Sequence, residues 1–480
     1  MNVRTRIAPS PTGFPHIGTI FQALFDYVYA RQHQGRFILR VEDTDRQRYV
    51  PTAEAAINSA LEWVGLKPDE GPAYGGEFGP YRQSERLDIY ATYAQKLIDQ
   101  EKAYYCFCSS ERLQQVRQDL QKQGLPPMYD QHCRHLGPHE AKLKAQSQPH
   151  VIRLKVPPDE TISFTDLIRG EISFASNTVD DQVLLKSDGY PTYHLGVVVD
   201  DHLMGITHIV RGEEWISSTP KHVLLYRYFN WDMPAIIHTP LLRNPDRSKL
   251  SKRHGHAAVS WYQEQGYLVE AVINFLATRV WNHPEGQEIF GIDELIKHFK
   301  WEEMHIQGPI VDLNKLDWIN GQWLRRLPDS ELVQRLQPFL PPGLTSTKLN
   351  EVLPLIKDRL VKLSDIGPMT QYLITDPLVP TELILKQSRL DPAATAAYLQ
   401  KVVTTINHLA SWDLSNLEAA LRQLQVNQGL KPRPAFMTIR VAVTSLTATP
   451  PLFDLMLLLG KVTVLKRLNQ TIAKLTTKPK

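Results

Sequence analysis

The chain has 480 residues, too many for one ordinary domain, so we expect about three to five domains. Hydrophobic content of 42%, charged content of 22% and an N-terminus without an apolar signal core exclude a membrane span and predict a cytoplasmic protein. The net charge is only +3, but residues 321–480 hold nearly twice as many Lys and Arg as Asp and Glu. That imbalance is typical of a surface that meets a polyanion, although a variably charged surface is the alternative.

The first residues indicate the start of a βαβ unit. Val3–Ile7 is a predicted strand, the prolines and the glycine of Ser10–Phe14 force a turn, and Ile17–Arg31 has apolar residues at helical spacing. A second predicted strand, Phe37–Val41, is followed directly by Glu42. Ligands of such folds bind outside the carboxyl ends of the strands, so we expect the turn and Glu42 to lie at one ligand site.

A second α/β stretch is predicted from about residue 180 to residue 250. Tyr193–Val199 and His208–Val210 are apolar runs that predict strands, and Asp200 and Asp201 follow the first of them. Acids after an apolar strand again suggest a site at a sheet edge.

The regions between and after these stretches have other patterns. Residues 86–180 predict charged helices and then a β-rich segment from Val151 to Phe174, which we interpret as an insertion that splits one nucleotide-binding fold. From about residue 255 onward the pattern is mostly helical, with breaks at Leu340–Gly343 and around Asp376–Pro377. We therefore expect two helical units after a linking region.

The start of the first predicted helix, His16-Ile17-Gly18-Thr19, suits a nucleotide phosphate. Free N–H groups and the positive end of the helix dipole favour anions, and His16 can donate to a phosphate oxygen. Gly18 leaves room where a nucleotide must approach closely. For the four residues alone, a solvated or core histidine is the alternative; the preceding strand and turn favour the nucleotide site.

A cluster of cations lies far downstream, in Lys249–Arg253. Lys249 and Lys252, with Ser251 between them, would stabilise the charge that develops on a leaving pyrophosphate. An ordinary solvated basic loop is the alternative. The chain has no GxxxxGK[ST] motif, which disfavours a P-loop nucleotide site.

Arg6, Arg211 and Glu42 are candidate contacts to an amino-acid substrate. Arginine binds carboxylates through two hydrogen bonds and so suits an acidic side chain, while Glu42 can accept from a substrate ammonium group. Surface ion pairs are the alternative for each of them. The position at strand ends favours site residues for Arg6 and Glu42.

The three cysteines and one histidine form a CxC…CxH set: Cys106, Cys108, Cys133 and His135. Cysteines confined to one region are not a disulfide framework. Three thiolates and one imidazole make a closed tetrahedral zinc site of the structural type. Three buried cysteines without a metal are the alternative; the mirrored spacing favours zinc.

At these residues the chain resembles the bacterial glutamyl-tRNA synthetases, a family of class I aminoacyl-tRNA synthetases. The resemblance extends over essentially the whole chain and is strongest in residues 1–255. It implies that glutamate and ATP form glutamyl-adenylate and pyrophosphate, that tRNA then accepts the glutamate, and that tRNA is needed even for the first step. The motifs that carry it are Arg6–Gly13 followed by His16–Thr19, Tyr193–Leu195 before Val199–Asp201, Arg211–Trp215, and the KLSKR form of the second signature, Lys249–Arg253.

The implied fold is α/β plus all-α, with a split Rossmann-type catalytic domain, an inserted domain and helical C-terminal regions. The expected segments are 1–85 and 189–245 for the two catalytic halves, 86–188 for the inserted acceptor-binding domain with the zinc site, 246–325 for the stem-contact region with the KLSKR loop, and 326–378 and 379–480 for two anticodon-binding domains.

The resemblance also implies residue roles. Mg²⁺ accompanies ATP. The residues it makes catalytic are His16, Gly18, Thr19, Lys249, Ser251 and Lys252, of which His16, Thr19 and Lys252 contact ATP; the residues it places around glutamate are Arg6, Ala8, Ser10, Glu42, Tyr193 and Arg211.

Selection between tRNAs is expected to depend on the first anticodon-binding domain. Members of the family that discriminate read the third anticodon base with an arginine, and the corresponding position here is Gly367. Glycine neither excludes a base nor donates from a side chain. We therefore hypothesise that the chain charges tRNA(Gln) as well as tRNA(Glu), and we expect it to act as a monomer.

Two other functions were weighed against this one. A truncated paralogue that glutamylates a modified base of tRNA(Asp) lacks the anticodon region, and the long basic C-terminal third argues against it. An RNA-binding protein with an inactive nucleotide fold is the other, and the intact His16, Lys249 and Lys252 argue against that.

Overall fold

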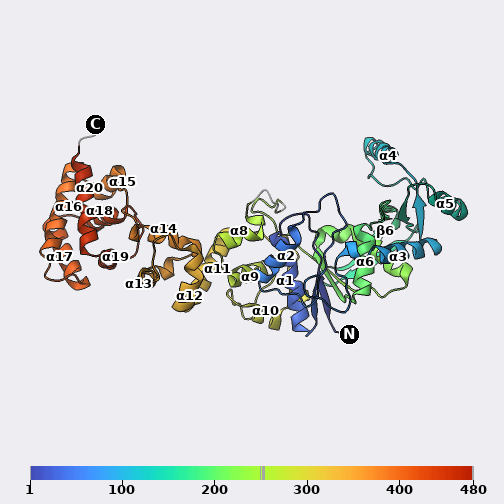
Figure 1. Ribbon diagram of the computed structural model, residues 1–480, viewed down its shortest axis with the longest axis horizontal. Coiled ribbons are helices and arrows are strands. Elements are labelled where there is room, and N and C mark those ends of the chain that lie inside the picture. The colour runs from blue at the N-terminus through green and yellow to red at the C-terminus, as the bar shows by residue number, and fades with distance from the viewer. Residues whose placement is uncertain (1, 249, 251–254, 478–480) are drawn as a thin grey trace. The chain divides into compact units, whose positions relative to one another are not determined.

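The computed structural model describes residues 2–248, 250 and 255–477 (Figure 1). The chain forms two compact units, one of residues Met1–Gln263 and Val269–Leu316 and one of residues Glu264–Leu268 and Asp317–Lys480. The first unit is α/β and the second is helical, which confirms the predicted fold class. The finer division into six segments stays a prediction.

The first unit contains all the strands described. They are β1 (Arg4–Ile7), β2 (Arg36–Leu39), β3 (Ala103–Cys106), β4 (Val151–Leu154), β5 (Thr161–Asp166), β6 (Gly170–Ala175), β7 (Val183–Leu185), β8 (His208–Gly212) and β9 (Ala235–Thr239). Its helices are α1 (Ile17–Gln32), α2 (Ala53–Trp63), α3 (Leu87–Asp99), α4 (Ser110–Lys122), α5 (Pro138–Ala145), α6 (Tyr193–Leu203), α7 (Thr219–Phe229), α9 (Val269–Thr278) and α10 (Ile292–His298). Two helices cross the division between the units: α8 (Val259–Glu264) with its last residue, and α11 (Leu313–Arg326).

The predicted βαβ start is confirmed. β1 and β2 pair in parallel, with Arg4 opposite Arg36 and Ile7 opposite Leu39. Between them, α1 buries a face that includes Leu24, Phe25 and Val28. Because the two strands are parallel, their carboxyl ends meet at one edge of the sheet.

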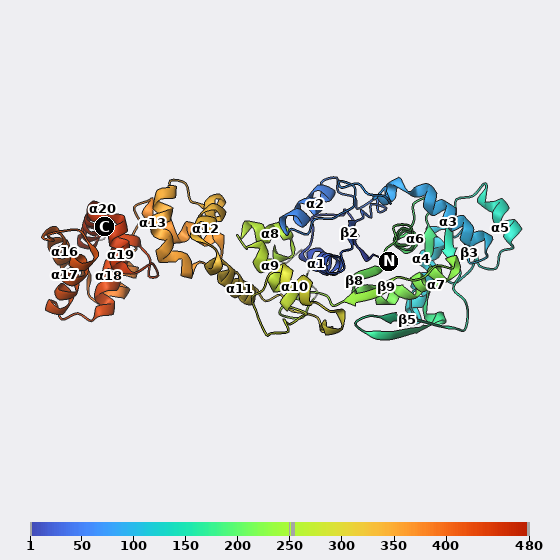
Figure 2. The same cartoon turned by 90° about the horizontal axis from the view of Figure 1, so that it is seen from below.

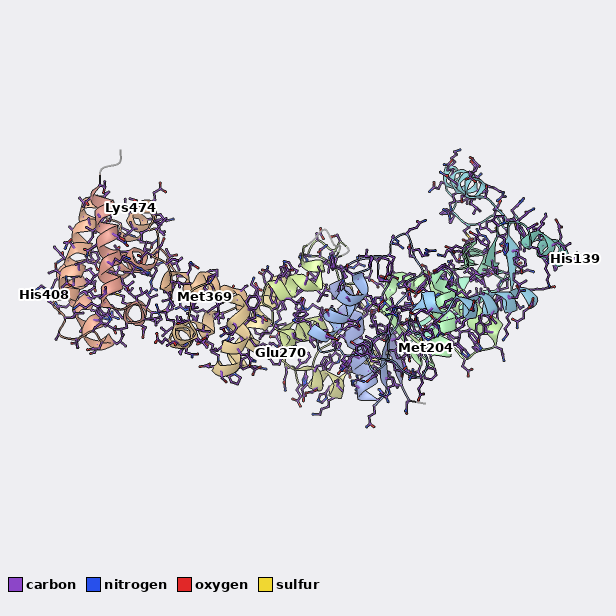
Figure 3. All side chains as sticks on the ribbon, in the orientation of Figure 1. His139, Met204, Glu270, Met369, His408 and Lys474 are labelled. Atoms are coloured by element: carbon purple, nitrogen blue, oxygen red, sulfur yellow. The ribbon has the colours of Figure 1, made fainter. Side chains whose placement is uncertain are left out.

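A four-stranded sheet, in the order β6-β5-β9-β8, adjoins this unit (Figure 2). β8 pairs with β9 and β5 with β9 in parallel, while β5 and β6 are antiparallel. β1 and β8 lie side by side, since the Thr207 amide donates to the carbonyl of Arg4 at 2.9 Å. Met204, labelled in Figure 3, packs beneath this junction with Ile38 and Ile209. The strands β5 and β6 of the predicted insertion therefore extend the sheet that contains β8 and β9.

The rest of the predicted insertion forms a separate three-stranded sheet. Its order is β3-β4-β7, with both pairs antiparallel. The expected charged helices are α3, α4 and α5, and the β-rich segment consists of β4, β5 and β6.

One predicted strand is wrong: Tyr193–Val199 is the first part of helix α6. Eight successive residues, 194–201, are buried in this helix. A helix that is buried on every side has no polar face, so its apolar run cannot be distinguished from that of a buried strand. Asp200 and Asp201 accordingly lie inside a helix and not after a strand.

The second unit is helical throughout the part that is described. Its core includes Leu421, Ile439 and Leu468, none of which is exposed. The predicted breaks at Leu340–Gly343 and around Asp376–Pro377 fall between helices. No helix of the described residues is long and apolar enough to cross a membrane. The helices are α12 (Asp329–Leu336), α13 (Ser346–Ile356), α14 (Ile366–Thr370), α15 (Thr381–Ser388), α16 (Pro392–Asn407), α17 (Leu414–Asn427), α18 (Pro432–Thr444), α19 (Leu452–Leu459) and α20 (Lys461–Thr476).

Candidate active site

A cavity of about 840 Å³ lies at the carboxyl ends of β1, β2 and β8. Its walls include Ile7 at the end of β1, Glu42 after β2, and Val210 near the end of β8. The six residues expected around glutamate all line it, together with Thr19: Arg6, Ala8, Ser10, Glu42, Tyr193 and Arg211. The position is the one that the parallel strands predict for a ligand.

A second cavity of about 240 Å³ lies at the start of α1 and shares Thr19, Gln22 and Trp215 with the first. His16 and Gly18 line it. His16 is the N-cap of α1, and its Nδ1 accepts from the Gly18 amide at 3.0 Å. The neutral ring therefore has its proton on Nε2, a donor of the kind that a phosphate oxygen accepts.

The glycine at position 18 has a steric reason. A Cβ there would lie 3.0 Å from His16 Nδ1 and would press on the ring. The predicted cations Lys249 and Lys252, and Ser251, lie outside the described residues. Leu250 between them is described; it is buried and lines the second cavity.

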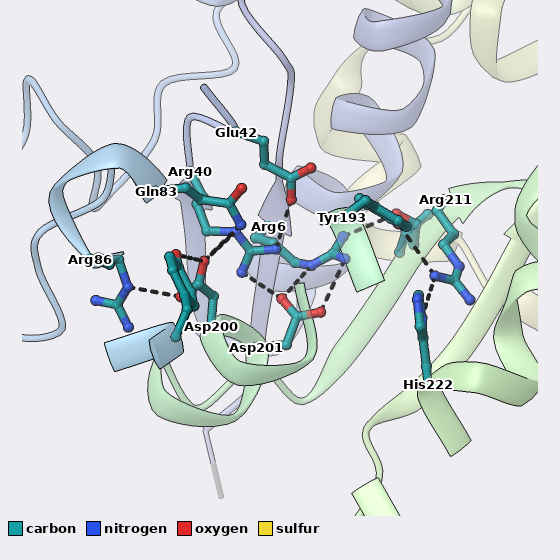
Figure 4. A network of polar contacts seen from close by, with 12 residues as sticks. Arg6, Arg40, Glu42, Gln83, Arg86, Tyr193, Asp200, Asp201, Arg211 and His222 are labelled. Atoms are coloured by element: carbon teal, nitrogen blue, oxygen red, sulfur yellow. Dashed lines mark hydrogen bonds and ion pairs between the residues drawn. The ribbon is translucent and has the colours of Figure 1, made fainter. Parts of the chain in front are cut away.

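A network of buried charges reaches the large cavity through Arg6 and Glu42, which line it (Figure 4). Arg6 makes two hydrogen bonds with Asp201, at 2.9 and 3.2 Å. Arg40 donates to Asp201 at 2.6 Å and to Glu42 at 3.2 Å. Asp201 is thus the shared counterion of two buried guanidiniums, Arg6 and Arg40. Arg6 thus has its counterion in the protein itself.

The neighbouring Asp200 makes hydrogen bonds that hold helices together. It accepts from Arg86 at 2.8 Å, from Gln83 at 2.9 Å and from the Tyr90 hydroxyl at 2.8 Å. These contacts join α6 to α3, so they hold the helix that carries Asp201. The sequence did not predict the contacts of Asp200 or of Asp201, because the segment that forms α6 was predicted as a strand.

Glu42 is a carboxylic acid whose pKa lies near neutral pH. It is 7% exposed, and burial raises its pKa to about 7, against the opposing effects of Arg40 and Arg6. Burial disfavours the charged form, and a nearby cation favours it. An ammonium group that enters the cavity would stabilise the carboxylate.

Arg211 differs from Arg6 in its partners. Its guanidinium is buried and bonds to uncharged groups: Tyr193, Thr219, His222 and His238. Among the described residues, no carboxylate forms an ion pair with it. A buried cation without an internal anion is costly unless a ligand supplies one. Arg211 therefore suits the carboxylate of an anionic ligand.

Two further residues of the cavity were not singled out from the sequence. Trp215 lies in the 3₁₀ helix Glu213–Ser218, lines both cavities, and packs its ring on that of Tyr193 with centroids 4.2 Å apart. Lys186 follows β7 and donates to the carbonyl of Thr44 at 3.0 Å. Trp215 is the last residue of the Arg211–Trp215 motif, whereas Lys186 belongs to no motif that would identify it from the sequence.

The three cysteines converge in the inserted region. Their sulfurs lie within 4.8 Å of one another, and Cys108 and Cys133 are 3.6 Å apart. Zinc–sulfur bonds of about 2.3 Å at tetrahedral angles give sulfur pairs about 3.8 Å apart, so the donor set fits zinc. His135 is exposed and is not part of the group. The Tyr129 hydroxyl lies 3.3 Å from Cys106 and 3.4 Å from Cys108 instead.

A second group of metal-ligand residue types is His283, Glu294 and His298. Both histidine Nε2 atoms lie 3.4 Å from one oxygen of Glu294. The Glu285 amide donates to His283 Nδ1 at 3.2 Å, so the neutral ring keeps its proton on Nε2 and donates it to Glu294. The lone pair that a metal would need is not available in that tautomer. The group is a hydrogen-bonded cluster.

Comparisons with known proteins agree with this geometry. The family model "tRNA synthetases class I (E and Q), catalytic domain" matches residues 2–318, and the model "Anticodon binding domain" matches residues 331–472. The fold, the cavity at the strand ends and the histidine at the start of α1 therefore define a class I aminoacyl-tRNA synthetase.

Relatives narrow the family further. "Glutamate--tRNA ligase" of Acidothermus cellulolyticus is 46% identical, over 98% of this chain and 96% of that one, and that of Thermus thermophilus is 44% identical, over 98% and 100%. A crystal structure of a glutamate tRNA ligase from Elizabethkingia meningosepticum, in complex with its amino acid, is 35% identical with a TM-score of 0.89, covering 99% of this chain and 100% of that one. The chain belongs to the glutamate--tRNA ligase family of class I aminoacyl-tRNA synthetases.

Proposed function

We propose that the large cavity binds L-glutamate, with its side-chain carboxylate on Arg211 and its ammonium group on Glu42. The observation that carries this proposal is the buried Arg211, which pairs with no carboxylate of the described residues, whereas Arg6 already forms an ion pair with Asp201. Arg6, Ala8, Ser10 and Tyr193 then shape the pocket around the substrate. Glutamine, which lacks the charge, would leave Arg211 without an anion.

ATP is proposed to occupy the smaller cavity, with Mg²⁺ accompanying its phosphates. His16 would donate through Nε2 to a phosphate oxygen, and Gly18 and Thr19 would border the nucleotide. The α-carboxylate of glutamate attacks the α-phosphorus, pyrophosphate leaves, and glutamyl-adenylate forms. Lys249, Ser251 and Lys252 are proposed, from their sequence motif, to stabilise the charge on the leaving pyrophosphate.

The tRNA range is proposed to include tRNA(Gln). Gly367 lies in α14, and a Cβ added there would meet no heavy atom within 4 Å. The fold thus gives no packing reason for glycine at this position, which supports a functional reason. Gly367→Arg is expected to lower charging of tRNA(Gln) relative to tRNA(Glu). Pro368→Arg is the control, because it adds the same charge at the next, exposed residue.

The cysteine group is proposed to hold a structural zinc ion. The three thiolates supply three ligands, and the Tyr129 hydroxyl is the nearest candidate for a fourth, in place of the expected His135. Zinc would cross-link the end of β3 to the segment around Cys133 and would take no part in the reaction.

Neither alternative function has support of its own. A truncated paralogue would lack the anticodon-binding region, which the family model matches at residues 331–472. An inactive nucleotide fold would not need the buried, balanced charges around Arg6 and Glu42. A cytoplasmic location and a monomeric state stay predictions.

Aminoacylation with purified components tests the proposal. The chain, ATP, Mg²⁺ and labelled glutamate are combined with tRNA(Glu) or tRNA(Gln) in separate reactions. Charging of both is the expected result. Charging of tRNA(Glu) alone would contradict the wider tRNA range, and charging of neither would contradict the proposed activity.

A further inference from the structure

The positioning of Arg211 depends on a histidine that must present a lone pair. Arg211 Nε donates to His238 Nε2 at 3.0 Å. An arginine side chain has donors only, so it can bond to His238 only where the ring nitrogen carries no proton. His238 is fully buried, and Arg211 is buried except where it lines the large cavity, so this bond is made inside the protein.

Asp166 selects that tautomer of His238. Its Oδ2 lies 2.7 Å from His238 Nδ1, and it also accepts from the His238 amide at 3.0 Å. Its Oδ1 accepts from the amides of Ile168 and Arg169, at 3.0 and 3.1 Å. A carboxylate has acceptors only, so the proton of the ring must sit on Nδ1 and the lone pair on Nε2.

The charge state of the pair is consistent with this role. Burial opposes the ionisation of Asp166, but the hydrogen bonds from His238 and from the backbone outweigh it and lower its pKa. Burial lowers the pKa of His238, with Arg211 acting in the same direction, although Asp166 opposes the shift. An ionised aspartate and a neutral imidazole are therefore the forms present near neutral pH.

A second histidine, His222, supports Arg211 in the same way (Figure 4). Its Nδ1 lies 3.0 Å from a terminal nitrogen of Arg211, and its Nε2 lies 3.1 Å from Nδ1 of His194. Since Arg211 needs an acceptor, His222 carries its proton on Nε2 and donates it to His194. Burial, with the charge of Arg211, lowers the pKa of His222 well below its usual range.

We propose that Asp166, through His238, is a positioning residue that orients Arg211 for the side-chain carboxylate of the substrate. The proposal rests on the assignment of Arg211 to that carboxylate. Asp166 ends β5, a strand of the inserted region, while Arg211 and His238 lie on β8 and β9. The insertion thus contributes to amino-acid recognition as well as extending the sheet.

Asp166→Asn tests the proposal by reversing the tautomer. An amide NH₂ in place of Oδ1 would face two backbone N–H groups, whereas in place of Oδ2 it would face one. The second orientation is therefore favoured, and it donates to Nδ1 of His238. The ring must then carry its proton on Nε2, which faces Arg211 Nε at 3.0 Å and Thr219 Oγ1 at 3.2 Å, so the acceptor for Arg211 is lost. We expect the KM for glutamate to rise roughly 10-fold or more, with the KM for ATP unchanged.

His238→Gln separates positioning from folding. A glutamine oxygen can accept from Arg211 without any choice of tautomer. In the His238→Gln background, Asp166→Asn should therefore change the KM for glutamate by less than about two-fold. If Asp166 had only a structural role, Asp166→Asn would raise the KM for glutamate by the same factor with His238 and with Gln at position 238. If Asp166→Asn does not fold, His238→Phe makes the same test, because it keeps the ring and removes the acceptor; the KM for glutamate must rise and the KM for ATP must not.

The measurements are steady-state ATP–pyrophosphate exchange in the presence of tRNA, with melting temperatures of each variant. Equal factors in the two backgrounds, or a KM for glutamate within about two-fold of the unmodified chain in Asp166→Asn, would overturn the proposal. Arg211→Lys separates failure of the role of Asp166 from failure of the assignment of Arg211 to the substrate carboxylate. If it alone raises the KM for glutamate, only the role of Asp166 fails; if it leaves that KM unchanged, the assignment of Arg211 fails.

Discussion

The raised pKa of Glu42 predicts a pH dependence of glutamate use. The substrate ammonium group is proposed to pair with the carboxylate form of Glu42, whose pKa in the free enzyme is raised by burial to about 7. At about pH 8 roughly nine-tenths of the groups are ionised, and at about pH 6 roughly one-tenth. The kcat/KM for glutamate should therefore fall about ten-fold between these values, since this parameter reports the groups of the free enzyme.

The assay is ATP–pyrophosphate exchange with tRNA at saturating ATP, with glutamate varied at each pH. Glu42→Gln should raise the KM for glutamate and remove most of its pH dependence. Asp45→Asn is the matched control: Asp45 lines the same cavity, but its hydrogen bond with Arg48 lowers its pKa, so the slope of the profile should not change. A kcat/KM for glutamate that is flat from about pH 8 to about pH 6 would refute the reasoning, as would an equal slope in Glu42→Gln.

Three other predictions concern the nucleotide, the metal and the helical unit. Lys252→Ala should lower kcat for activation with little change in the KM for glutamate, because it removes a contact made to the leaving pyrophosphate; an unchanged kcat would contradict the role. Metal analysis should find about one zinc per chain and well under one in Cys133→Ser, and an equal zinc content in both would contradict the site. Ile439→Ala should lower the free energy of unfolding of the helical unit by about 2–5 kcal/mol in a denaturant titration, since Ile439 is fully buried, whereas Val462→Ala, at an 83% exposed position, should change it by less than about 0.5 kcal/mol. Equal effects would contradict the packing described.

The pocket proposed for glutamate is the part of the site whose residues the sequence predicted best, since all six of them line one cavity. Arg6, Glu42 and Arg211 lie far apart in the chain, but each stands in or just after a strand of a parallel arrangement. Such strands bring their carboxyl ends to one edge, so a motif at each strand end is enough to predict that the side chains meet.

The different partners of Arg6 and Arg211 could not be predicted in this way. Arg6 forms an ion pair with Asp201, which lies on α6, a helix whose buried surface on every side resembles a strand in sequence. The contact between Asp166 and His238 joins residues 72 positions apart. A single sequence contains no signal for such a pairing.

The proposed zinc site shows the limit of spacing arguments. The CxC…CxH pattern brought the three cysteines together correctly, since their sulfurs converge. It also suggested His135, whose side chain is exposed, and it passed over Tyr129, whose hydroxyl lies beside two of the sulfurs. Spacing gives the distance along the chain but not the direction of a side chain.

We propose that Arg211 makes this pocket specific for a glutamate side chain. ATP–pyrophosphate exchange in the presence of tRNA, with glutamate, glutamine and aspartate compared at equal concentration, tests it most directly. We expect exchange with glutamate and a loss of at least about 100-fold with glutamine, because glutamine leaves the buried guanidinium without an anion. Exchange with glutamine at a comparable rate, or no exchange with glutamate, would contradict it.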